Sequence, residues 1–177
     1  QVEGQEQREP RQRLQAARSC LGDWLHAPGA RQAHITLFVC GFASPQPVHN
    51  DDIAPAVLEA QCHALTALRQ PAFELHIGDL DSFTSAAFLA VQEHGHLDRL
   101  RDTLAGLAPE VRQAPYAPHL TVGLYRRAVA RATWQQHTRA LRDCPPLALP
   151  VRELQLLSYV ASEPQGALRI EARVALG

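Results

Sequence analysis

One short pattern, a His and a Thr two residues apart inside an apolar run, occurs twice in this chain. His34-Ile35-Thr36-Leu37 and His119-Leu120-Thr121-Val122 begin 85 positions apart (119 minus 34). Both runs have the composition of a strand, and in a strand residues i and i+2 lie on the same face. Each segment is therefore predicted to present an imidazole beside a hydroxyl and to bury its other apolar residues on the opposite face.

The elements predicted around the two motifs also follow nearly the same order twice. Hydrophobic spacing predicts helices over 9–26, 51–69, 96–108 and 129–142, and strands over 33–42, 72–80, 86–92, 118–126, 147–160 and 167–176. Asp51 or Asp52 is the predicted cap of the second helix, and residues 1–3 are a candidate remnant of a leading strand.

This near-repeat predicts an α+β fold of two pseudo-symmetric lobes. Two small antiparallel sheets face a central cleft, and the helices lie outside them. At 177 residues, the whole range 1–177 is expected to form a single domain.

The composition excludes several classes of function. All 17 basic residues are Arg, so a Schiff-base lysine, a P-loop lysine and a lysine-adenylating ligase are ruled out. A formal net charge of −1 argues against a protein that coats long nucleic acid. The four scattered cysteines form no C-x-x-C, and no apolar run is long enough to span a bilayer. We expect a reduced, cytoplasmic monomer that does not bind membranes.

The stretches Gln32–Phe42 and Pro115–Tyr125 resemble the two motif segments of the two-histidine (2H) phosphoesterase superfamily. The resemblance is to its bacterial 2′-5′ RNA ligase-like, or RNA 2′,3′-cyclic phosphodiesterase, branch, and it covers nearly the whole chain from about residue 9. It implies a bilobal fold with both motifs lining one cleft. It also implies that His34 and His119 are the catalytic acid–base pair, and that Thr36 and Thr121 donate hydrogen bonds to phosphate oxygens.

The chemistry of these side chains supports the same interpretation. Opening a 2′,3′-cyclic phosphate with water needs one neutral and one protonated imidazole, each typically worth roughly 10²–10⁴-fold in rate. No metal and no cofactor are expected, and the predicted ligand is an RNA 2′,3′-cyclic phosphate end or a cyclic nucleotide. Two alternatives remain open: ATP-independent 2′-5′ RNA ligase activity at the same site, and a non-catalytic module that binds a nucleotide or an RNA end. Which histidine is the base also stays open.

Two aromatic residues follow the motifs on the predicted site face. Phe38 and Tyr125 are predicted either to contact a base in the cleft or to pack in the core, with Gly123 leaving room beside Tyr125. The resemblance fails at one position, because many relatives place a phosphate-binding Arg five residues after the second motif histidine. Leu124 stands there in this chain, so Tyr125, Arg126 or an arginine from elsewhere is the candidate substitute.

Overall fold

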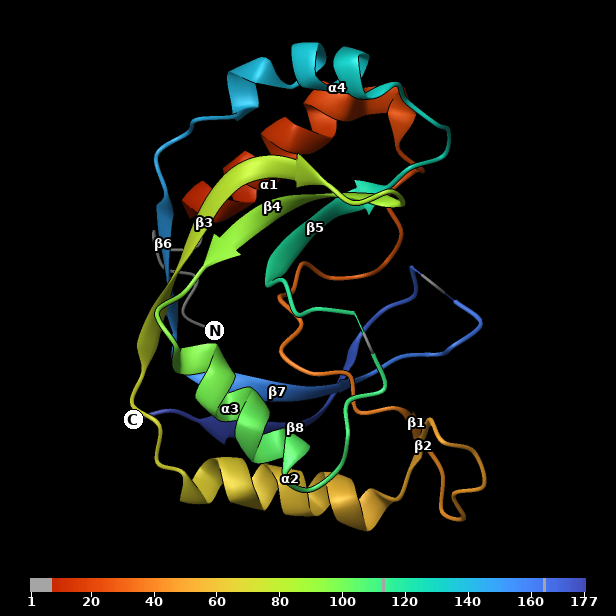
Figure 1. Cartoon of the computed structure of the whole chain (residues 1–177), viewed down its shortest axis with the longest axis vertical. Helices are drawn as coiled ribbons and strands as arrows, with labels where there is room; N and C mark the ends of the chain where they lie inside the picture. Colours follow the sequence, from red (N-terminus) through yellow and green to blue (C-terminus); the bar gives the residue numbers. More distant parts are fainter. Residues whose placement is uncertain (1–7, 113, 164) are drawn as a thin grey trace.

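Two antiparallel sheets with helices on their outer sides make up most of this computed structural model (Figure 1). It describes residues 8–112, 114–163 and 165–177, so the predicted strand remnant at 1–3 lies outside the described residues. The helices are α1 (Arg8–Leu21), α2 (Pro55–Ala67), α3 (His96–Ala105) and α4 (Arg131–His137), with 3-10 turns η2 (Gly22–Trp24) and η3 (Arg139–Leu141). The strands are β1 (Phe42–Ala43), β2 (Asp52–Ile53), β3 (Phe73–Ser82), β4 (Ala86–Gln92), β5 (His119–Leu124), β6 (Leu147–Val151), β7 (Glu153–Ser158) and β8 (Arg169–Ala175).

The upper lobe in Figure 1 contains the larger sheet, in the order β5-β4-β3-β6, with α1 and α4 above it. The hydrophobic spacing that predicts the first helix fits the structure, because Leu14, Ala17 and Leu21 are buried on α1. They pack against Leu120 and Val122, which β5 directs away from its motif side chains. Burial of these two residues confirms the alternation predicted for the second motif.

The lower lobe contains α2, α3 and the β7–β8 hairpin (Figure 1). Its core joins Leu97, Leu100 and Leu104 of α3 to Val174 of β8. The ten-residue strand β3 contributes to both cores, with Phe73 and Leu75 in the lower and Ile77 and Leu80 in the upper. One continuous strand therefore ties the two lobes together. The predicted α+β class, with two small antiparallel sheets and outer helices, is confirmed.

The predicted strand over 33–42 is wrong as a ladder-forming strand. In this segment the structure has a single isolated antiparallel bridge, Ile35 to Leu120, before β1 begins at Phe42. Side chains take the place of a neighbouring strand farther along the segment. Tyr116 donates its hydroxyl to the carbonyl of Thr36 (3.0 Å), and Arg101 donates to the carbonyl of Leu37 (2.5 Å).

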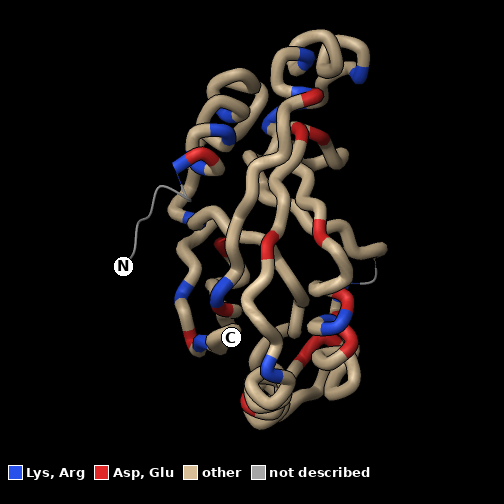
Figure 2. Tube along the Cα trace, turned by 90° about the vertical axis from the view of Figure 1, so that its left-hand side faces the viewer, with Lys and Arg blue, Asp and Glu red and all other residues tan. Residues whose placement is uncertain are grey.

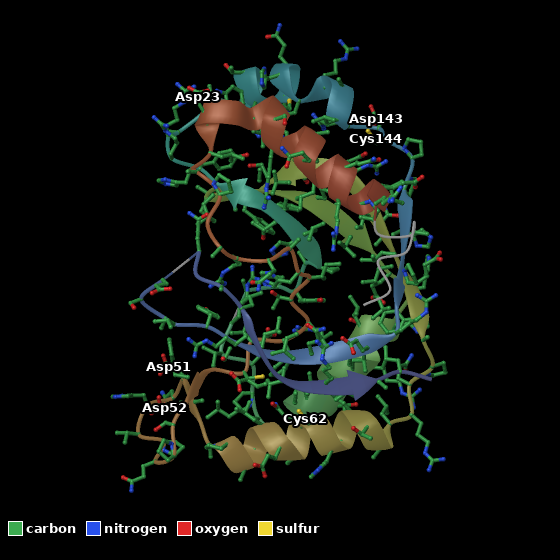
Figure 3. All side chains as sticks on the ribbon, turned by 180° about the vertical axis from the view of Figure 1, so that it is seen from behind. Asp23, Asp51, Asp52, Cys62, Asp143 and Cys144 are labelled. Carbon is green, nitrogen blue, oxygen red and sulfur yellow. The ribbon has the colours of Figure 1, made fainter. Side chains whose placement is uncertain are left out.

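Two other predicted boundaries change for tertiary reasons. The strand expected over 147–160 divides into β6, which pairs with β3, and β7, which pairs with β8. The second helix begins at Pro55, and Asp52 lies in β2 beside the β1–β2 loop (Figure 3). The Asp52 carboxylate accepts hydrogen bonds from the backbone N–H groups of Val48 and His49, so it closes that loop and does not cap the helix. The same two bonds hold the pKa of this carboxyl below its ordinary value.

Acidic and basic positions are interspersed along the trace of both lobes (Figure 2), in keeping with the net charge of −1. Within the described ranges, no helix is long and apolar enough to cross a membrane.

Candidate active site

The two motifs meet at their middle residues. Ile35 and Leu120 form the isolated antiparallel bridge, so the first motif segment lies against the free edge of β5. An antiparallel register that continues one residue to either side places His34 opposite Thr121 and Thr36 opposite His119. Directly opposed side chains lie on the same face, and diagonal neighbours are about 7–8 Å apart. The meeting of all four motif side chains on one face, with the two imidazoles on a diagonal, stays a prediction that this single bridge supports.

Both motif histidines make the same local hydrogen bond. His34 Nδ1 lies 2.9 Å from the carbonyl oxygen of Gln32, and His119 Nδ1 lies 2.7 Å from that of Ala117. A carbonyl oxygen only accepts, so Nδ1 carries the proton in each ring and donates it. This fixes the tautomer and leaves Nε2 of each histidine to take up or release a proton.

The His119 ring rests against an aromatic pair that sequence reasoning missed. Phe83 and Phe88 stack with ring centroids 4.1 Å apart, and both meet the imidazole edge-on, at 5.0 Å and 5.5 Å. Phe88 is the β4 register partner of Thr121. The β4–β5 register places Phe88, and the turn between β3 and β4 places Phe83 against it, so no local pattern in the sequence marks this pair.

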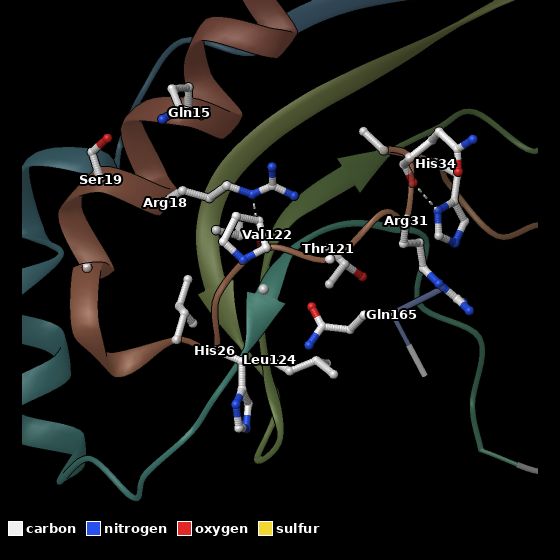
Figure 4. Close-up of a pocket in the computed structure, with 17 residues that line it drawn as sticks. Gln15, Arg18, Ser19, His26, Arg31, His34, Thr121, Val122, Leu124 and Gln165 are labelled. Atoms are coloured by element: carbon white, nitrogen blue, oxygen red, sulfur yellow. Dashed lines mark hydrogen bonds between the residues drawn. The ribbon is translucent and has the colours of Figure 1, made fainter. Parts of the chain in front are cut away.

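A pocket of about 390 Å³ opens beside the motifs (Figure 4). Two isolated antiparallel bridges, Leu25–Tyr125 and Ile35–Leu120, join the chain to the edge formed by β5 and Tyr125. The pocket lies where the segment between them, residues 26–34 (the bowed segment), curves away from this edge. His34 and Thr121 line this pocket, one residue from each motif, whereas Thr36 and His119 are not among its lining residues. The pocket therefore adjoins the motif face along one side.

Two arginines line the same pocket. Arg18 comes from α1, and its Nε donates to the carbonyl of Val122 (2.8 Å) at the edge of β5. Arg31 comes from the bowed segment, and its Nε donates to the carbonyl of Gly166 (3.3 Å). Leu124, at the position where the resemblance predicts an arginine, also lines the pocket. The sequence offered no pattern that singled out either arginine.

The bowed segment comes close to the loop that joins β7 to β8. A Cβ atom on Gly29 would lie 2.5 Å from the Cβ of Gln165, so only glycine fits there. Gln32 strengthens this contact, because its side chain both donates to the carbonyl of Leu168 (3.2 Å) and accepts from its N–H (2.8 Å). The wall of the pocket is therefore anchored on the far side from α1.

Phe38 and Tyr125 lie in packed surroundings and do not line the pocket. Phe38 packs against the lower core, with the Arg101 guanidinium 5.8 Å from its ring centroid. The Tyr125 hydroxyl is hydrogen-bonded to Ser82 Oγ (2.9 Å) and accepts from the indole N–H of Trp134 (2.7 Å). The space that Gly123 leaves is filled by the side chain of Leu25. Contact of either ring with a substrate base stays a prediction.

A partly buried ion pair supports the first motif segment. Arg101 and Glu110 lie 2.6 Å apart, with side chains 18% and 13% exposed. Glu110 also accepts from the N–H of Val39 (2.9 Å), and Arg101 lies over the Tyr116 ring at 3.8 Å. Burial raises the pKa of the Tyr116 phenol to about 12, so this hydroxyl is a stable donor to the Thr36 carbonyl.

Across the described parts of the chain, no group of three or more His, Cys, Asp or Glu is placed to hold a metal ion.

Comparison with known proteins now adds to this geometry. The family model of the 2′-5′ RNA ligase superfamily matches residues 6–163. E. coli LigT complexed with 3′-AMP is similar in structure, with a TM-score of 0.61, 20% sequence identity and coverage of 95% of this chain and 91% of that one. The protein TT0787 of Thermus thermophilus has a TM-score of 0.66 at 17% identity, with 95% and 92% covered.

A third structure, described as a phosphoesterase, has a TM-score of 0.61 at 19% identity, with 95% and 92% covered. No curated protein matches the chain in sequence. At these identities the structural likeness shows the fold, and the family match extends over most of the chain. The chain therefore belongs to the 2′-5′ RNA ligase superfamily, among the 2H phosphoesterases.

Proposed function

We propose that this protein is a metal-independent phosphodiesterase that uses water to open the 2′,3′-cyclic phosphate end of RNA or of a nucleotide. The observation that carries the proposal is the equivalent pose of the two histidines. Both present Nε2 from a ring whose Nδ1 donates to the carbonyl two residues earlier, and the two motifs are bridged at their centres. Such a pair matches a reaction that needs one proton acceptor and one proton donor.

In the proposed step, two proton transfers accompany the exchange of one bond to phosphorus for another. Nε2 of one histidine takes a proton from water as the water oxygen bonds to phosphorus. The bond between phosphorus and one ribose oxygen breaks, and Nε2 of the other histidine, protonated beforehand, gives its proton to that oxygen. Thr36 and Thr121 donate hydrogen bonds to the non-bridging oxygens, whose charge grows in the transition state. The ring opens to a phosphate monoester beside a free hydroxyl.

The relatives support a nucleotide phosphate as the ligand. Crystal structures of E. coli LigT hold 3′-AMP, ATP, NADP⁺ and phosphate. The pocket beside His34 and Thr121 has a volume within the range of about 300–1,000 Å³ that is usual for small-molecule sites. A nucleotide placed there would bring its phosphate to the motif face.

Single substitutions of the two histidines test the proposal. His34→Ala and His119→Ala are each expected to lower kcat by about two orders of magnitude or more, because each removes one half of the proton transfer. The measurement is hydrolysis of a panel of nucleoside 2′,3′-cyclic phosphates in the presence of EDTA, which should leave the wild-type rate unchanged. The exposed His63 on α2 supplies the matched control, His63→Ala. Full activity in either motif variant would refute the acid–base assignment.

Ligation is the second candidate, favoured by the family match. A 5′-hydroxyl of a second RNA strand would replace water as the nucleophile and join the two ends without ATP. Incubating RNA with 2′,3′-cyclic phosphate and 5′-hydroxyl ends distinguishes the two reactions, because hydrolysis gives a phosphate monoester and ligation gives a longer strand. Tight binding of a nucleotide without either product would indicate a non-catalytic module.

A further inference from the structure

The pocket reaches well beyond the motif residues that border it. From His34 and Thr121 it extends along the edge of β5 to Leu124 and across to α1. Its lining includes Arg18 and Arg31 and, among the residues that the structure describes, contains no Asp or Glu. Glu163 lines an adjoining hollow and not this pocket. The pocket is therefore a positively charged site, with space for more than a single reacting phosphate.

Arg31 is fixed in place but not neutralised. Its backbone N–H donates to the carbonyl of Gln165 (3.1 Å), its Nε donates to Gly166, and its guanidinium carbon lies 4.1 Å from the ring centroid of Tyr159. Its Nη2 is buried and has no hydrogen-bond partner in the described part of the structure. Nor does any carboxylate there pair with this guanidinium. A guanidinium that has no carboxylate partner, and one of whose N–H groups is desolvated without an acceptor, costs free energy, part of which a bound anion would recover.

Arg18 faces the same space from the opposite side. Figure 4 shows it extending from α1 toward Val122, while Arg31 and His34 lie beyond Thr121. The bond from Nε to the Val122 carbonyl uses one of five N–H donors and orients the guanidinium. A planar guanidinium with its terminal N–H groups available suits the oxygens of a phosphate.

We propose that Arg18 and Arg31 bind a second phosphate of the substrate, beside the cyclic phosphate held by the two motifs. A cyclic phosphate occupies the 2′ and 3′ oxygens of the ribose, so the second phosphate is the one on the 5′ oxygen. This inference rests on the proposed function, since it takes the motif face to be the site of the cyclic phosphate. It predicts preference for a terminal nucleotide that carries a 5′-phosphate over a nucleoside 2′,3′-cyclic phosphate with a free 5′-hydroxyl.

The test compares matched ligands that differ only in the 5′-phosphate. Calorimetry measures the binding of adenosine 3′,5′-bisphosphate against adenosine 3′-phosphate, and kinetics measures kcat/KM for adenosine 2′,3′-cyclic phosphate with and without a 5′-phosphate. In the wild type the 5′-phosphate should improve both quantities by about 10–100-fold, the usual size of a charge-assisted contact. In Arg31→Gln and in Arg18→Gln that ratio should fall toward one, and Arg31→Lys should retain part of it.

Arg139→Gln is the matched control, because Arg139 is exposed in η3 and does not line the pocket. It should keep the wild-type ratio. If Arg31→Gln disturbs the loop over 165–168 and fails to fold, Arg18→Gln still decides the question, because Arg18 lies on α1. A wild-type ratio near one, or a full ratio in the arginine variants, overturns the inference.

A third outcome also overturns the inference. An equal loss on both substrates in Arg31→Gln would assign that residue to the reacting phosphate and leave no second subsite. If the wild type hydrolyses no cyclic phosphate, the proposed function fails, and the binding ratio of the bisphosphate to the monophosphate still decides the arginine subsite on its own.

Discussion

At the scale of single residues, His34 and His119 are held alike although their surroundings differ. One lies in an irregular segment and the other begins β5, yet each Nδ1 donates to the carbonyl two residues earlier. This bond spans only two residues, so an extended backbone is enough to allow it. The apolar alternation of the sequence predicts that local backbone, which is why the histidines and threonines can be recognised before any tertiary contact is known.

The shared bond predicts one tautomer for both rings. In the neutral form His34 and His119 should carry the proton on Nδ1 and leave Nε2 unprotonated, because the carbonyls of Gln32 and Ala117 only accept. Long-range ¹H–¹⁵N NMR correlations of the imidazole nitrogens measure this directly, and the exposed His63 serves as the comparison. A neutral Nε2–H form in either motif histidine would show that its nitrogen is not poised as the base.

At the scale of elements, the first motif segment shows where sequence reasoning stops. Alternation predicts an extended chain over 33–42, but not which groups bond its backbone. Those groups include Arg101, Glu110 and Tyr116, more than 60 positions away along the chain, and no local spacing links them to the motif. The division of 147–160 between two sheets has the same origin, because each half follows the strand it pairs with.

Tyr116 gives this support a measurable dependence on pH. Its pKa in the folded protein is about 12, above the ordinary value of 10.0, so the fold favours the neutral phenol. The resulting stabilisation is complete below pH 10 and is lost as the pH rises from 10 to about 12. The difference in free energy of unfolding between wild type and Tyr116→Phe should therefore shrink across that window, as measured by urea unfolding at each pH.

Tyr159→Phe, with an exposed ring, is the control for removing a phenol. A difference that stays constant to pH 12 would contradict the burial of the Tyr116 hydroxyl.

At the scale of the whole molecule, the near-repeat predicted two related lobes but not how the chain divides between them. The upper core takes residues from α1, β5 and α4, and the lower core from α2, α3 and β8. Each lobe thus combines elements from both halves of the sequence, and the motif bridge lies where the halves meet. The positions of Arg18 and Arg31 around one pocket depend on this mixing of the two halves of the sequence. Their pocket is lined both by residues of α1 and by Gln165, and Arg31 bonds the carbonyl of Gly166, 135 positions later, a contact that only the assembled fold creates.

Ile35 is the residue at which this arrangement is most directly tested, because it packs against both cores and forms the bridge to Leu120. Ile35→Ala should lower the free energy of unfolding by about 1–3 kcal/mol, less than for a fully buried isoleucine because the side chain is only partly buried. Since β3 runs through both cores, urea unfolding should remain a single transition.

Ile170→Ala, at a side chain 46% exposed on β8, should change stability by no more than about 0.5 kcal/mol. The Ile35→Ala variant should also lose activity on a cyclic phosphate beyond its loss of stability, because the bridge of Ile35 to Leu120 joins the centres of the two motifs. Two separate transitions, or a destabilised variant with full kcat/KM, would show that the lobes and the paired motifs are not coupled through this residue.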